Sequence, residues 1–168
     1  NALLNQAYIN TYKSGDFHQR LSSLQTALPL LKQGGDWFSV AGCFGLMGEC
    51  YHALGENNSA ITFYDSSIHL FQQLGDTVTS VWQLIDEAHS YSDMDNVSAA
   101  YKAFHTAQEL TPKKDTLLQG YTYCYLAQLF WYANLPEIAI EYMNKVRAFQ
   151  QTFTPQQKKN LSWQLSWA

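Results

Sequence analysis

The side chains best suited to chemistry are two pairs of potential metal ligands. Glu49 and His52 are three residues apart and His89 and Asp93 are four apart, so each pair would share one face of a helix. Imidazole and carboxylate groups bind Zn²⁺, and the two pairs together would supply four ligands. Such pairs are also common on helical surfaces. A metal-dependent site on these four residues is therefore an alternative here, and the main expectation is no metal and no other cofactor.

Catalytic motifs are absent. The chain contains no G-x-S-x-G, no H-E-x-x-H, no phosphate-binding glycine loop and no dinucleotide fingerprint. Cys43 and Cys50 would lie about 10.5 Å apart along a helix, at its rise of 1.5 Å per residue, whereas a disulfide needs Cα atoms within about 7 Å. We expect these cysteines and Cys124 to be buried thiols in a reducing compartment. The prediction is a protein that is not an enzyme, with any activity in a domain outside this segment.

The composition favours a folded domain with an uncharged polar surface. Of 168 residues, 46% are apolar and 15% aromatic, which argues against disorder, but only 14% are charged. The net charge is −4 and the ten Lys and Arg residues are scattered, so no nucleic-acid partner is expected. The apolar run 123–130 is too short to span a membrane. We expect a cytoplasmic location, with the periplasm as the alternative, and a segment of a larger protein.

Small and aromatic residues recur at intervals near forty. The set Ala60, Tyr64 and Ser67 would share one helix face, because its members are four and three residues apart. Its later copies are Ala100-Phe104-Ala107 and Ala139-Met143-Val146, and its weaker earlier copy is Arg20-Leu24-Ala27. The pattern predicts four repeated units rather than one irregular domain.

Turn residues divide each unit into two helices. Within units they are Ser14-Gly15, Leu54-Gly55, Met94-Asp95 and Ala133-Asn134, and between units they are Gly34-Gly35-Asp36, Leu74-Gly75-Asp76 and Thr111-Pro112. Asp36 and Asp76 are predicted N-caps, and Thr154-Pro155 is predicted to start a further helix. The expected array is all-α, with repeats at about 3–34, 36–74, 76–112 and 115–152 and an extra helix at 154–168.

The pattern resembles the tetratricopeptide repeat (TPR) family. The residues that carry the resemblance are Gly48, Tyr51, Leu54, Gly55, Ala60 and Tyr64, with Ala88, Tyr91, Ala100, Phe104 and Ala107 in the next unit. The resemblance implies a right-handed superhelix of stacked antiparallel helix pairs that binds proteins or peptides. A unit near 40 residues is similar to the longer-helix variety in bacterial signalling regulators, such as transcription regulators and GGDEF diguanylate cyclases.

In such arrays the first helix of each unit lines the concave face. The resemblance places there Asn5, Ile9, Tyr12, Glu49, His52, Trp82, Ile85, His89, Tyr121, Gln128, Trp131, Tyr132 and Trp163. After Lys13, the first helices of units two to four contain no Lys or Arg, so capture of a C-terminal carboxylate is not expected. Aromatic planes with hydrogen-bonding groups suit apolar peptide side chains or a small uncharged ligand such as a sugar. The competing interpretation is that these aromatics pack against the next unit.

Three glycines stand at three-residue spacing in one predicted helix. Each of Gly42, Gly45 and Gly48 costs about 1 kcal/mol relative to alanine. Gly48 is the small residue of the repeat. Gly42 and Gly45 are explained either by a notch in the groove or, slightly better, by close packing against unit one.

We therefore expect a binding module, the regulatory or sensor region of a larger bacterial signalling protein. Its partner would be a protein, a peptide or a small uncharged ligand. The alternative is a structural scaffold that self-associates without ligand, as a homodimer for example, through exposed aromatics including Trp163 and Trp167.

Overall fold

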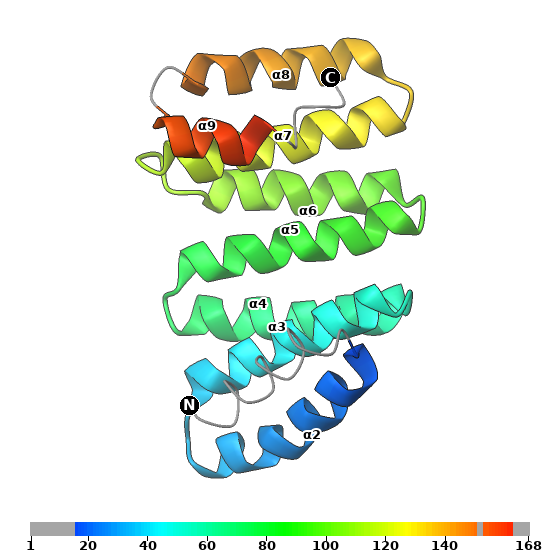
Figure 1. Cartoon of the computed structure of the whole chain (residues 1–168), viewed down its shortest axis with the longest axis vertical. Helices are drawn as coiled ribbons and strands as arrows, with labels where there is room; N and C mark the ends of the chain where they lie inside the picture. Colours follow the sequence, from blue (N-terminus) through cyan, green and yellow to red (C-terminus); the bar gives the residue numbers. More distant parts are fainter. Residues whose placement is uncertain (1–15, 151–152, 163–168) are drawn as a thin grey trace.

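The computed structural model describes residues 16–150 and 153–162. In this part of the chain every regular element is an α-helix, as predicted, and Figure 1 shows the helices up to residue 150 stacked in chain order. The helices are α2 (Phe17–Gln33), α3 (Trp37–Ala53), α4 (Asn57–Gln73), α5 (Thr77–Asp93), α6 (Val97–Leu110), α7 (Thr116–Tyr132), α8 (Pro136–Gln150) and α9 (Pro155–Ser162). The first helix expected in unit one and the turn Ser14-Gly15 lie outside the described residues.

From α2 to α8, each helix packs against the next one along the chain. The pairs α3–α4, α5–α6 and α7–α8 form three helical hairpins, and α5 also touches α3 on one side and α7 on the other. Each helix therefore meets only near neighbours in sequence, as in a solenoid. The first helices of successive hairpins thus lie next to one another and form one continuous face, which we call the α3–α5–α7 face.

The predicted caps start the helices. Asp36 accepts a hydrogen bond from the Ser39 backbone N–H at 3.1 Å, and Asp76 accepts one from Thr79 at 3.0 Å. At α9, the Gln157 backbone N–H donates to the Thr154 hydroxyl, and the Thr154 N–H donates to the Gln157 side chain. This reciprocal pair is a capping box, and Pro155 occupies the first turn behind it.

Left-handed residues end the helices at the predicted turns. Gly35, Gly55 and Gly75 have φ of 68°, 77° and 76°, values that cost glycine little because it has no Cβ. Asp95 and Asn134 take the same position in later turns with φ of 56° and 60°. Asp95 is therefore a carboxylate at a place where three other turns carry glycine.

Small residues and aromatic rings interlock in the core, as the repeat predicts. A Cβ on Gly48 would lie 2.7 Å from the Tyr64 ring, so only glycine admits the ring at this distance. Ala60, Ala100 and Phe104 are almost completely buried in the same cluster. In the weak first copy, Arg20 occupies the position of the small residue. Its buried guanidinium forms an ion pair with Glu49 of α3 at 2.9 Å.

The cysteines are free thiols buried in the helices, as expected. Burial raises the pKa of Cys43 and of Cys50 to about 11 and that of Cys124 to about 12, so the reactive thiolate is suppressed. Across residues 16–150 and 153–162, every helix falls short of the length and apolar character that a membrane crossing requires.

The described neighbours of Gly45 belong to units two and three. A Cβ on Gly45 would meet the Gln83 side chain of α5 and would lie 3.2 Å from the Ser67 hydroxyl of α4. The glycine thus admits the following hairpin, and the predicted packing against the first helix of unit one lies outside the described residues. Gly42 has no described residue within 4 Å of a built Cβ, and it lines a hollow in the α3–α5–α7 face.

Candidate functional site

The α3–α5–α7 face has no Lys or Arg on its own helices. Glu49 of α3 is paired with the Arg20 guanidinium from α2, and Asp93 of α5 is paired with His52 of α3. The three helices therefore offer no Lys or Arg side chain to an acidic partner.

The seam between α3 and α5 has a polar contact at one end and a hollow nearer the other. His52 Nε2 and Asp93 Oδ2 lie 2.8 Å apart and join the carboxyl ends of the two helices. Nearer their amino ends, a hollow of about 340 Å³ opens between them. Its lining includes Gly42, Gly45, Glu49, Phe71, Gln83 and Asp86.

Two side chains of this first hollow are poorly solvated. Burial, with a smaller contribution from the nearby Glu49 carboxylate, raises the pKa of the Asp86 carboxyl to about 7. The Gln83 side-chain oxygen is buried without a hydrogen-bond partner among the described residues. Both features cost folding free energy, because water no longer solvates these groups.

The seam between α5 and α7 is built from aromatic rings. Trp82 meets Tyr121 edge-on with ring centroids 5.5 Å apart. His89 lies edge-on to Phe104 and to Tyr125, with centroids 5.3 and 4.7 Å apart. Burial, with a smaller contribution from the adjacent His52, lowers the pKa of His89 to about 4, so the imidazole is neutral at pH 7.

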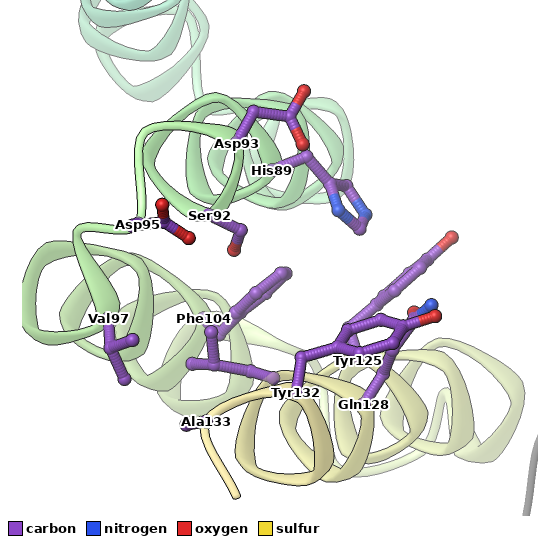
Figure 2. Close-up of a pocket in the computed structure, with 11 residues that line it drawn as sticks. His89, Ser92, Asp93, Asp95, Val97, Phe104, Tyr125, Gln128, Tyr132 and Ala133 are labelled. Carbon is purple, nitrogen blue, oxygen red and sulfur yellow. The ribbon is translucent and has the colours of Figure 1, made fainter.

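A second hollow, of about 310 Å³, opens beside these rings. Phe104, Leu129 and Val97 provide apolar surface, and the remaining lining residues are His89, Ser92, Asp93, Asp95, Tyr125, Gln128, Tyr132 and Ala133. Figure 2 shows Ser92 and Asp95 on one side of the space and Tyr125, Gln128 and Tyr132 on the other. Its size lies at the lower end of the range of small-ligand pockets, about 300–1,000 Å³. The space therefore suits one side chain or a small molecule.

The structure separates the predicted site residues into groups. His89, Gln128 and Tyr132 meet in the second hollow, whereas Glu49 and His52 belong to the α3–α5 seam. Trp82 and Tyr121 contact each other, and Trp131 is exposed but does not line either hollow. Asn5, Ile9, Tyr12 and Trp163 lie outside the described residues.

Ile85 requires a correction. It is only 1% exposed and belongs to the central apolar cluster, so it offers no surface to a ligand. The inner-face position that the resemblance assigned to Ile85 therefore lies on the buried side of α5. On α5 the exposed positions of this face are Trp82, which is 36% exposed, and Asp93.

The four potential zinc ligands do not converge. Glu49 is paired with Arg20, His52 is paired with Asp93, and His89 is enclosed by aromatic rings. Among the described residues, no three His, Cys, Asp or Glu side chains come together in a geometry that holds a metal ion. The metal-dependent alternative thus has no assembled site in this part of the chain.

Sequence reasoning missed Ser92, Asp95 and Tyr125. Tyr125 is three residues before Gln128 and seven before Tyr132, a spacing that puts all three on one helix face and that was available in the sequence. Asp95 was assigned only to a turn. Its turn position could have indicated a special role, because the equivalent residues of other turns are Gly35, Gly55 and Gly75 and a carboxylate is unusual there.

No protein-family model matches this chain, and no curated protein matches it in sequence. Solved structures do match it in fold. BtubC (BKLC) from P. vanneervenii superposes with a TM-score of 0.76 at 14% identity, over 89% of this chain and 63% of that one. A Podosopora anserina putative kinesin light chain with nearly identical TPR-like repeats has a TM-score of 0.73 at 13% identity, over 89% and 74%. A single-residue variant of that same protein gives 0.75 at 13% identity, over the same shares.

These similarities define the class of the fold. The protein is an all-α solenoid of stacked helix pairs, similar to TPR-like repeat proteins, as its small-and-aromatic pattern predicted. The matched region corresponds to 63% of BtubC, and at identities near 14% the likeness establishes architecture alone.

Proposed function

We propose that this chain is a non-catalytic binding module that holds a segment of a protein partner along its α3–α5–α7 face. The observation that carries the proposal is the combination, on one face, of two side-chain-sized hollows and exposed aromatic rings. Tyr and Trp are the residues that contribute most binding free energy at protein interfaces, because they bury a large area at small entropic cost.

The spacing of the hollows favours an extended or helical segment over a compact ligand. The two hollows occupy successive seams, so a chain that crosses α5 would place one side chain in each. TPR-like solenoids are built from such seams, and an extended groove is the surface that stacking creates. A small uncharged ligand is the competing occupant, and it would fill a single hollow.

The resemblance to repeats of bacterial signalling regulators extends the proposal. Under that extension the groove is the sensor region of a larger protein, and a segment bound across several units favours one spacing of the hairpins over another. Small-angle scattering with and without a bound peptide tests this step. Identical dimensions in the two states would refute the mechanism while leaving the binding function intact.

The binding function can be tested with a phage-displayed library of random dodecapeptides. Peptides selected on the wild-type protein are expected to lose at least about tenfold in affinity, or about 1.4 kcal/mol, on Tyr132→Ala or Trp82→Ala. Ile140→Ala is the matched control, since this side chain on α8 is also exposed but outside both hollows. A library that yields no binder, or binders insensitive to both groove variants, would overturn the proposal.

A second candidate, a self-associating scaffold, has one observation in its favour. Trp37, Phe38, Leu74 and Val78 are all exposed near the turns that join α2 to α3 and α4 to α5. Exposed apolar side chains gathered at one edge are typical of contact surfaces. Sedimentation over a range of concentrations decides it: a dimer that dissociates on Phe38→Asp supports the scaffold, and a monomer at every concentration refutes it.

A further inference from the structure

The second hollow combines an apolar floor with an acidic rim. Phe104 is 1% exposed and Leu129 is 6% exposed, so both present only a small surface at the bottom of the space. Asp93 and Asp95 are exposed residues at its edge, with Ser92 preceding them in the chain. A matching ligand would thus be apolar along its length and polar at its end.

The charges around this hollow all have one sign at neutral pH. None of the lining residues is Lys or Arg, and His89 is neutral because burial lowers its pKa to about 4. Asp93 Oδ2 lies within hydrogen-bond distance of His52 Nε2, but Asp95 belongs to the turn after α5 and faces the space beside Ser92 (Figure 2). The complementary group is therefore a cation.

The backbone at Asp95 makes this carboxylate an unusual choice. Its φ of 56° is disfavoured for a residue with a Cβ, and the equivalent turns use Gly35, Gly55 and Gly75. Asn134 shows that an amide of the same shape also adopts this conformation in the chain. Glycine would relax the turn but would leave the hollow without this carboxylate.

We propose that the hollow between α5 and α7 receives a lysine or arginine side chain of the bound partner segment, with its hydrocarbon stem against Phe104 and Tyr132 and its cationic head beside Asp95 and Asp93. This inference rests on the proposed function, because a protein segment presents the side chain. Tyr132, at 72% exposed, and Tyr125 add aromatic faces that attract a cation. The long stems of lysine and arginine pack on apolar surface while the head stays at the polar rim.

The test compares a cationic probe with its neutral isostere. Binding of N-acetyl-arginine methylamide and of N-acetyl-citrulline methylamide is followed by NMR, with the side-chain amide of Gln128 as the local reporter. The arginine derivative is expected to bind at least about fivefold more tightly, since charge-assisted hydrogen bonds are roughly twice as strong as neutral ones. Added salt should reduce the difference, because the contact is at the surface.

Asp95→Asn is the decisive variant, because it removes the charge while keeping a side chain that Asn134 shows to be compatible with the turn. It should bring the arginine affinity down to the citrulline value. Asp95→Gly should lower the arginine affinity to the same value. It should also raise the melting temperature, because glycine adopts the left-handed conformation with less strain. Glu56→Gln is the matched control: it removes an exposed carboxylate from the α3–α4 turn, outside the hollow, and should leave the preference unchanged.

The outcomes separate this inference from the function on which it rests. Equal affinity for the two probes, or a preference that survives Asp95→Asn, would overturn the basic-residue pocket. If dodecapeptides selected on the groove also lack enriched Lys and Arg, the binding function stands and the pocket assignment falls. If the arginine probe is preferred through Asp95 but the library yields no binder, the pocket stands and the protein-segment function falls.

Discussion

The two seams of the α3–α5–α7 face use the same backbone for different chemistry. Between α3 and α5, Gly45 lets the helices approach, and the contacts are polar: the His52–Asp93 pair and the Gln83 side chain over Gly45. Between α5 and α7, rings meet edge-on and hold a neutral imidazole among them. Both seams enclose a hollow of similar volume, about 340 and 310 Å³.

The repeat therefore determines how the helices stack, and the residues that face the groove determine what lines each hollow. Helix packing is repeated because the small residue and the aromatic ring of each hairpin are repeated. The residues that face the next first helix are under no such constraint. The helices stack in the same way at both seams, but carboxyl and amide groups line the first hollow and aromatic rings line the second.

The largest effect is expected where the aromatic seam meets the core. Phe104→Ala removes a ring that is buried, stacked near Tyr125 and edge-on to His89. We expect it to lower the free energy of unfolding by about 3–5 kcal/mol, because no neighbour can fill the space. Denaturation with urea measures the change.

Tyr132→Ala is the control for this prediction. Its ring lines the same hollow but is 72% exposed, so the variant should change stability by no more than about 0.5 kcal/mol. Similar losses for the two variants would mean that the aromatic seam is not anchored through Phe104.

A smaller effect distinguishes the two glycines of the polar seam. Gly45→Ala places a methyl group against the Gln83 side chain and the Ser67 hydroxyl, and Gly42→Ala meets no described residue within 4 Å. Gly45→Ala should therefore be less stable than Gly42→Ala by about 1 kcal/mol, the lower end of the cost of overpacking, because the end of the Gln83 side chain can shift. Thermal or urea unfolding compares the two. If Gly45→Ala is the more stable, Gln83 moves freely and the seam does not depend on the glycine.

The smallest expected effect depends on pH. The pKa of Asp86 is raised from 3.8 to about 7, so the folded protein retains this proton between about pH 4 and 7 while the unfolded chain releases it. The Asp86 contribution to stability is therefore lost as pH rises through that window. Asp86→Asn has no such loss, and its gain in melting temperature over the wild type should be larger at pH 8 than at pH 5.

We expect the difference between the two pH values to be about 2–4 °C, equivalent to about 1 kcal/mol for a chain of this size. This is less than the roughly 2.7 kcal/mol that two pH units correspond to, because the Asp86 side chain keeps some exposure to water. Glu56→Gln serves as the control, since its carboxylate is exposed. A constant gain for Asp86→Asn at both pH values would mean that water reaches this carboxyl in the folded protein.

Much of the local structure could be predicted because it depends on short-range rules. Asp36 and Asp76 cap the helices that follow them, Gly55 and Gly75 adopt left-handed conformations, and Gly48 admits Tyr64. Each of these follows from a few residues and their spacing. Ile85 was placed wrongly for the opposite reason: whether a helical position faces a groove or the core depends on the rotation of the whole helix against its neighbours.

The hairpins, their turns and the absence of Lys and Arg from α3, α5 and α7 follow from residues close together in the chain, since caps, glycines and charges act within a few residues. Which side chains from different hairpins meet depends on how whole helices pack. Packing of α5 against α3 and α7 pairs His52 with Asp93 and encloses His89 with rings from α6 and α7. The same packing places Asp95, a residue of the turn after α5, at the edge of a hollow, because this hollow forms only where two hairpins meet.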